Sequence, residues 1–186
     1  MEQEQHRKKL QVDIVSDVVC PWCIIGYKQL LKALESLPGY FDVAIAWHPF
    51  ELNPGMPPEG QDLREHLAQK YGSSTQQSQS ARMRLSQLGE SLGLTFDYFE
   101  GMRMVNTFRA HQLLHWASGV GMQTELKLAL FEAFFSRRED VNDSTVLTKV
   151  VKRVGLDTVE AGCVLEDGRY AEPVREEQQL WLEREV

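Results

Sequence analysis

The 186 residues, 42% of them hydrophobic, suffice to bury a core, so the composition excludes a disordered or fibrous chain. Twenty Lys and Arg residues against 27 Asp and Glu residues give a net charge of -7 without a basic cluster, so we expect no nucleic-acid partner and no membrane partner. The charged start of the chain lacks an apolar secretory signal, and three cysteines make no disulfide framework, so we expect a globular, cytoplasmic protein.

The first predicted elements are a solvated tail over residues 1–10 and a β-strand over residues 12–18, where Val and Ile favour an extended chain. Two cysteines follow directly, Cys20 and Cys23 in the sequence Cys-Pro-Trp-Cys. Pro21 suits the first position of a helix because its missing N–H costs nothing there, and the apolar residues after it have helical spacing. The sequence therefore predicts a helix from Pro21 with Cys20 at or near its N-cap.

This position predicts redox chemistry for the two thiols. A helix N-terminus offers unpaired N–H groups and a positive dipole to a thiolate, so we expect Cys20 to be the attacking thiol with a lowered pKa. Cys23 is expected to resolve the mixed disulfide and to keep a pKa near or above that of free cysteine. The alternatives are two ordinary buried cysteines and a zinc half-site, which would need a second Cys or His pair. We expect no metal, no cofactor besides the Cys20-Cys23 disulfide, and a buried, inert Cys163.

A second strand is predicted over residues 42–47, where the chain alternates and is rich in residues that favour strands. Strand, helix and strand together make a βαβ unit with parallel strands, and ligands gather at the carboxyl ends of such strands. His48 follows the second strand and therefore reaches the same edge as the thiols. We predict that His48 tunes the thiolate or contacts substrate; a histidine that is merely hydrogen-bonded in a loop is the alternative.

Residues 61–168 are predicted to form a helical insertion after a Pro- and Gly-rich connector. Asn106 suits an N-cap of one of its helices, and a contact to a bound thiol is the alternative role. The apolar residues 96–105 show no clear period, so they either pack between the lobes or form a hydrophobic wall beside the thiols. Helices are expected over residues 62–71, 81–92, 106–117 and 124–136, from Asp143 and Asp157 onward, and over 171–186.

Four segments together carry a resemblance to a known family: Cys20–Cys23, Trp47–Pro54, Asn106–His111 and Leu130–Phe135. Over residues 11–186 the chain resembles the FrnE-like branch of the DsbA family of thiol-disulfide oxidoreductases. The resemblance implies an α/β, thioredoxin-like fold in two parts, residues 11–60 and 169–186, with the helical insertion between them.

The resemblance also implies an activity. It implies an enzyme that exchanges disulfides with protein thiols, with Cys20 as nucleophile and Cys23 as resolving thiol, while Pro21 and Trp22 shape the turn that partners approach. The same superfamily contains kappa-class glutathione transferases and chromene-carboxylate isomerases, which carry serine where Cys20 stands. A glutathione-dependent transferase or isomerase is therefore an alternative, in which Asn106 and His48 would hold the small thiol, as is a redox-sensing, chaperone-like binding module.

One part of the family pattern has no counterpart in this sequence. Members of the family continue into a cis-proline loop, a β-hairpin and a final helix, and the neighbouring backbone of the cis-proline pairs with substrate. Two strands are also few for a parallel sheet, which normally has neighbouring strands. We therefore expect the 186 residues to belong to a longer polypeptide, which an intact mass would test.

Overall fold

The computed structural model describes residues 7–185, so residues 1–6 of the predicted tail lie outside the described part of the chain. The secondary structure elements, in chain order, are β1 (Lys8–Ser16), α1 (Pro21–Glu35), β2 (Phe41–Pro49), β3 (Gln61–Asp62), α2 (Leu63–Tyr71), α3 (Thr75–Glu90), β4 (Arg103–Met104), α4 (Phe108–Gly119), α5 (Gln123–Phe135), α6 (Ser144–Arg153), α7 (Thr158–Asp167) and α8 (Ala171–Glu183).

The two long strands form the predicted parallel pair. Their register runs from Lys8 opposite Phe41 to Ser16 opposite Pro49. The predicted boundary between tail and strand at residue 10 is wrong, because β1 begins at Lys8. Backbone pairing extends the strand through this polar start, where the N–H of Lys8 also donates to the carbonyl of Tyr40 at 2.8 Å. Side-chain polarity alone therefore misplaced the start of β1.

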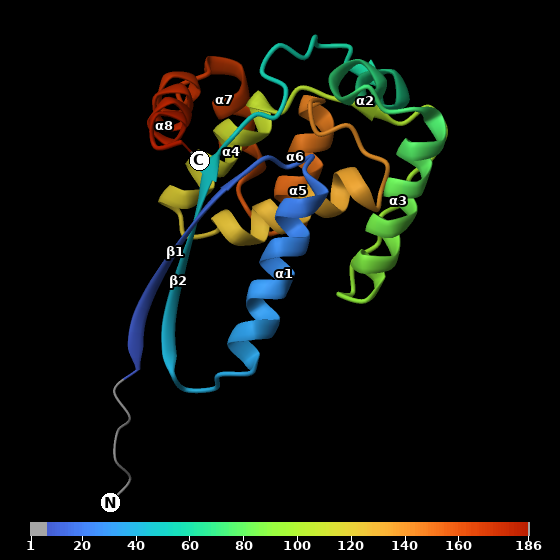
Figure 1. The fold of residues 1–186 in the computed structure, drawn as a ribbon. Coiled ribbons are helices and arrows are strands. Elements are labelled where there is room, and N and C mark those ends of the chain that lie inside the picture. The colour runs from blue at the N-terminus through green and yellow to red at the C-terminus, as the bar shows by residue number, and fades with distance from the viewer. Residues whose placement is uncertain (1–6, 186) are drawn as a thin grey trace, which may run out of the picture.

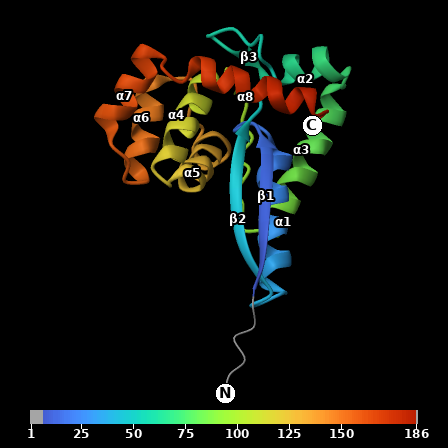
Figure 2. The same cartoon turned by 90° about the vertical axis from the view of Figure 1, so that its left-hand side faces the viewer.

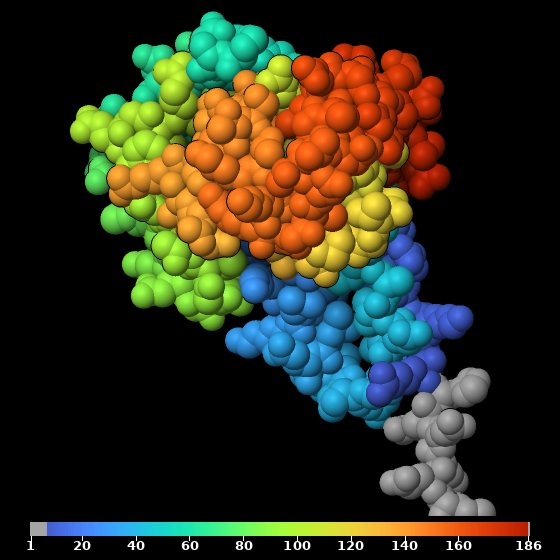
Figure 3. All heavy atoms as spheres, turned by 180° about the vertical axis from the view of Figure 1, so that it is seen from behind, coloured from blue at the N-terminus to red at the C-terminus, as the bar shows by residue number. Residues whose placement is uncertain are grey.

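The predicted α/β fold with a helical insertion is confirmed, and the layers are clear in two views. Helix α1 lies along one face of the strand pair, and the insertion surrounds the carboxyl ends of the strands (Figure 1). Helix α8 crosses the opposite face near the same ends (Figure 2). The space-filling view shows α6 and α7 on the near face of the insertion, with α1 and the amino-terminal halves of the strands projecting below it (Figure 3).

The insertion contains a short second sheet that periodicity did not predict. Strands β3 and β4 pair antiparallel, Gln61 opposite Met104. Gly60 makes this close approach possible: it has a φ of 68°, and a Cβ there would lie 2.4 Å from the carbonyl oxygen of Met104. The apolar segment 96–105 thus passes the start of α2, where the backbone N–H of Leu63 donates to the carbonyl of Met102 at 2.9 Å.

One buried position was predicted wrongly. Cys163 is exposed rather than buried. Helix α7 turns Ala161 and Val164 inward, both with 0% exposure, which leaves Cys163 on the solvent side of the same helix. Among residues 7–185, no helix combines the length and apolar character needed to cross a lipid bilayer.

Candidate active site

The two thiols lie where strand β1 gives way to helix α1. Cys20 is the N-cap residue, with extended backbone angles (φ -96°, ψ 110°), and proline occupies the first turn of the helix. The N–H of Cys23 donates to the carbonyl of Cys20 at 3.2 Å, which closes the turn. Both cysteines are free and partly buried. The predicted placement of Cys20 at the helix N-terminus is confirmed.

The pair divides its acidity unequally, and in the opposite sense to our expectation. A hydrogen bond from Cys20 lowers the pKa of Cys23 to about 6, against the opposing effect of burial. The same hydrogen bond, together with burial, raises the pKa of Cys20. Cys23 attracts the charge because the side chain of Ser16 and the ammonium of Lys127 also lower its pKa. Since one proton is shared along the bond, the pair titrates as a unit.

A cavity of about 340 Å³ opens beside Cys20 and does not reach Cys23. The active-site turn forms one wall, α2 and α3 form the other, and residues of the 96–105 segment and α5 complete it. Trp22 is 62% exposed beside it. The lining residues are Val19, Cys20, Pro21, Trp22, Leu52, Asn53, Leu63, His66, Leu67, Lys70, Tyr71, Ser73, Gln77, Ser78, Ala81, Arg82, Leu85, Tyr98, Met102, Met104, Phe134 and Phe135.

The lining is apolar with a basic bias. It includes Lys70 and Arg82 but no Asp or Glu, although acidic residues outnumber basic ones in the whole chain. Lys70 donates to the carbonyl of Leu52 and to Oδ1 of Asn53, both at 2.7 Å, so its ammonium is held at the wall. Burial raises the pKa of Tyr98 to about 12, so its phenol stays protonated at neutral pH. The cavity can hold an apolar side chain or a small anionic thiol next to Cys20.

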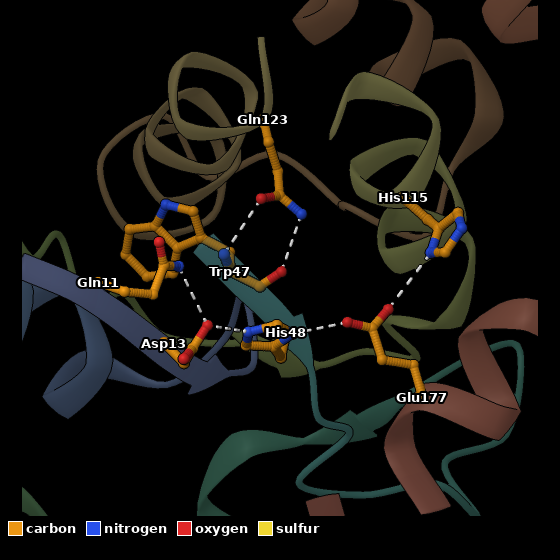
Figure 4. Close-up of polar contacts among 7 residues, drawn as sticks. All are labelled: Gln11, Asp13, Trp47, His48, His115, Gln123 and Glu177. Carbon is orange, nitrogen blue, oxygen red and sulfur yellow. Dashed lines mark hydrogen bonds and ion pairs between the residues drawn. The ribbon is translucent and has the colours of Figure 1, made fainter. Parts of the chain in front are cut away.

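The structure brings Pro21 and Trp22 to this cavity but not His48, whose ring is fully engaged elsewhere. Its Nδ1 lies 2.6 Å from Oε1 of Glu177 on α8, and its Nε2 lies 2.9 Å from Oδ1 of Asp13 on β1. The second oxygen of Glu177 lies 3.3 Å from Nδ1 of His115 (Figure 4). The two carboxylates therefore direct His48 to the α8 side of the sheet, where it joins α8 to the strands.

Asn106 also lies outside the cavity lining. Its Oδ1 accepts from the N–H of Phe108 at 2.9 Å, and its Nδ2 donates to the carbonyl of Met56 at 3.1 Å. The N-cap position of α4 belongs to Thr107, one residue later than predicted. The side-chain amide of Asn106 thus fixes the backbone just before α4, and both its oxygen and its nitrogen are hydrogen-bonded to backbone groups.

Sequence reasoning missed a group of buried polar side chains behind the turn: Ser16, Asp17, His111 and Lys127. Asp17 joins three elements, since its Oδ1 accepts from the N–H of Val18 at 2.7 Å and lies 3.2 Å from Nε2 of His111, while its Oδ2 accepts from the N–H of Leu52 at 2.8 Å. The signal was available: Lys127 follows the inward Leu126 and stands one turn before Phe131 in a mostly apolar helix.

A parallel βαβ unit whose helix begins at a Cys-x-x-Cys dithiol, with a helical lobe that forms one wall of the adjoining cavity, defines a thioredoxin-fold dithiol protein. The family model of the DSBA-like thioredoxin domain matches residues 11–186. The chain therefore belongs to the DSBA-like thioredoxin family, which confirms the predicted DsbA resemblance.

Individual relatives agree with this assignment. A probable DsbA oxidoreductase, SCO1869 from Streptomyces coelicolor, is 31% identical with a TM-score of 0.88, covering 95% of this chain and 76% of its own. The uncharacterized protein YwbO of Bacillus subtilis is 26% identical over 167 residues, covering 90% of this chain and 77% of its own. The cytosolic disulfide reductase DsbM from Pseudomonas aeruginosa, 20% identical with a TM-score of 0.63 over 91% of this chain and 75% of its own, shares the fold.

Proposed function

We propose that the protein is a thiol-disulfide oxidoreductase that exchanges disulfides with protein thiols through Cys20 and Cys23. The observation that carries this proposal is the placement of two free thiols at a helix N-terminus, with only Cys20 facing the cavity. A polypeptide substrate would present its disulfide to Cys20 while an apolar side chain enters the cavity. Cys23, which lies behind, would resolve the mixed disulfide.

The exchange proceeds in two displacements. The thiolate of the pair, with its charge on Cys20 at the moment of attack, bonds to one sulfur of a substrate disulfide and releases the other sulfur as a thiolate. Cys23 then passes its proton to that thiolate or to solvent and attacks the sulfur of Cys20, which releases the second substrate thiol. The shared hydrogen bond between the thiols allows the charge to reach Cys20 before attack.

Insulin reduction by dithiothreitol tests this proposal with two variants. Cys20→Ser should abolish turnover, because the nucleophile is gone, and Cys23→Ala should accumulate a mixed disulfide that mass spectrometry detects on Cys20. Cys163→Ser is the matched control, since this exposed thiol lies on α7, outside the cavity lining, and should leave the rate unchanged. Full activity of Cys20→Ser would show that the proposal is wrong.

A second candidate is the use of glutathione as the small thiol or as a transferase substrate. Lys70 and Arg82 favour it, because a lining with two cations and no carboxylate suits a ligand that carries carboxylates. A structure of DsbM, 21% identical, is described with GSH. Saturable glutathione binding to a Cys23→Ala variant, without dithiol turnover, would favour this function over the first. Loss of that binding in Arg82→Gln would assign the ligand to this cavity.

We also propose that the reaction takes place in the cytosol. The proposal is supported by DsbM, a relative of the same fold that is described as a cytosolic disulfide reductase. Trapping the redox state of Cys20 and Cys23 in growing cells with an alkylating reagent tests this assignment. A predominantly reduced pair would agree with it, and a fully oxidised pair would argue against it.

A further inference from the structure

A buried lysine of the helical insertion lies behind the dithiol turn. Lys127 belongs to α5 and is 1% exposed. Its Nζ donates to the carbonyl oxygen of Ser16, the last residue of β1, at 3.0 Å. The ammonium also lies 5.4 Å from the ring centroid of Trp47 and 5.2 Å from that of Phe131. Helix α5 thus places a cation at the carbonyl of Ser16, the end of β1, and Ser16 precedes Cys20 by four residues.

A buried ammonium with one neutral acceptor is costly, so its charge must be balanced nearby. The groups whose charges act on Lys127 are Asp17 on the β1–α1 connection and the thiols of Cys20 and Cys23 at the start of α1. On its other side, Lys127 lines a small cavity with His48, His115 and Glu177. His111 of α4 lies beyond, against Asp17. The carboxylate oxygens of Asp17 already contact two backbone N–H groups and His111, so Asp17 balances the positive charge of Lys127 only in part.

We propose that Lys127 is a positioning residue for the dithiol: its ammonium, fixed by the carbonyl of Ser16, stabilises the thiolate of the reduced pair and so sets the redox potential from the helical insertion. This inference rests on the proposed function of the Cys20-Cys23 pair. The negative charge of the thiolate balances the part of the Lys127 charge that Asp17 does not balance. When the disulfide forms, that negative charge is lost.

The acidities of the groups agree with this geometry. Burial lowers the pKa of Lys127 to about 8, against the opposing effects of Asp17 and the two thiols, so the side chain is mostly charged at neutral pH. Lys127 is in turn one of the causes of the lowered pKa of Cys23. Ser16 connects the two, because its carbonyl accepts from the ammonium and its side chain also helps to lower the pKa of Cys23.

The redox step balances without another charged group. The reduced pair, one thiolate and one thiol, reacts with a disulfide RSSR to give the protein disulfide, one RS⁻ and one RSH. The protein loses two electrons and one proton, and the substrate gains both. Stabilisation of the thiolate therefore favours the reduced protein and makes its potential less negative.

Two neutral substitutions separate the charge from the hydrogen bond. Lys127→Met removes both, whereas Lys127→Gln keeps an N–H donor for the carbonyl of Ser16 and removes only the charge. Lys152→Met, on the exposed surface of α6, is the matched control for charge removal. The thiolate is titrated by its absorbance near 240 nm, and the potential is measured against defined ratios of oxidised and reduced dithiothreitol.

We expect Lys127→Met and Lys127→Gln each to raise the lower pKa of the pair by about one unit, and Lys152→Met to leave it unchanged. At pH 7, raising a pKa of about 6 by that amount lowers the equilibrium constant for reduction about fivefold, which makes the potential about 20 mV more negative. The difference should vanish by pH 5, where wild type and variants are both protonated.

Three results would overturn the inference: a folded Lys127→Gln with wild-type titration and potential, a shift equal to that of Lys152→Met, or a potential difference that persists unchanged at pH 5. Because these readouts use no protein substrate, they are independent of the insulin assay. Full insulin reduction by Cys20→Ser would refute the proposed function without changing the titration of Lys127→Gln.

Discussion

The outer edge of β2 is covered by a side chain instead of another strand. Oε1 of Gln123 accepts from the backbone N–H of Trp47 at 3.1 Å, and its Nε2 donates to the carbonyl of the same residue at 2.8 Å. The ring nitrogen of Trp47 adds a bond to the hydroxyl of Thr124 at 3.0 Å. One amide at the start of α5 thus satisfies both backbone groups that a neighbouring strand would satisfy, and it fixes the insertion to the sheet.

Replacing this amide should measurably destabilise the protein. Gln123→Ala removes two partly buried hydrogen bonds, each worth about 1 kcal/mol net, and leaves their backbone partners to water that reaches them poorly. We therefore expect the free energy of unfolding to fall by about 2 kcal/mol. For a chain of this length that corresponds to a midpoint lower by roughly 4 to 8 °C.

Urea denaturation followed by tryptophan fluorescence measures the loss. Gln79→Ala is the matched control, because Gln79 is an exposed glutamine of α3, and it should change the free energy of unfolding by less than about 0.5 kcal/mol. Gln123→Glu should lie between wild type and Gln123→Ala, since it keeps the acceptor and loses the donor. If Gln123→Ala were as stable as the control, the edge of β2 would not depend on this amide.

Three other predictions concern acidity and backbone geometry. Despite burial, hydrogen bonds from a histidine and the backbone lower the pKa of Asp17. The stability that its carboxylate contributes should therefore be present above pH 4 and be lost as pH falls through its folded pKa. Urea unfolding between pH 7 and pH 2 should show that the free energy of unfolding of Asp17→Asn depends less on pH than that of wild type. The first thiol of the Cys20-Cys23 pair should titrate near pH 6 by its absorbance near 240 nm, and equal titration of both thiols near pH 8.5 would contradict the shared proton. Gly60→Ala should cost about 2 kcal/mol or more in urea unfolding because its Cβ meets a backbone oxygen at positive φ, whereas Gly26→Ala, in open space on α1, should be neutral or stabilising; equal midpoints would refute this.

Local signals in the sequence predicted the elements that local bonds create. Asp62, Asp143 and Asp157 were expected to begin helices, and each accepts hydrogen bonds from the first backbone N–H groups of its helix. The Val-rich strand followed by Pro21 likewise predicted the turn that holds Cys20. These features depend on residues within a few positions of one another, which is why one sequence suffices to predict them.

What could not be predicted depends on partners distant in the chain. Glu177, 129 residues after His48, holds its ring on the α8 side, and no spacing near His48 announces this partner. Strand β3 is only two residues long, too short for a period, and exists through pairing with β4. The pKa of Cys23 depends first on the hydrogen bond from Cys20 and also on the distant Lys127, so the local argument from the helix N-terminus did not predict how the two thiols share their proton.

The span of the contacts behind the turn has a consequence for synthesis of the protein. Lys127 reaches Ser16 across 111 residues of chain, and Gln123 reaches Trp47 across 76. Contacts between such distant residues form late, after local strands and helices. A ribosome adds 5 to 20 residues per second, so roughly 5 to 20 s pass between the emergence of Cys20 and that of Lys127. Throughout that interval the nascent chain carries two thiols without the buried cation, and their thiolate should be less stable until α5 docks.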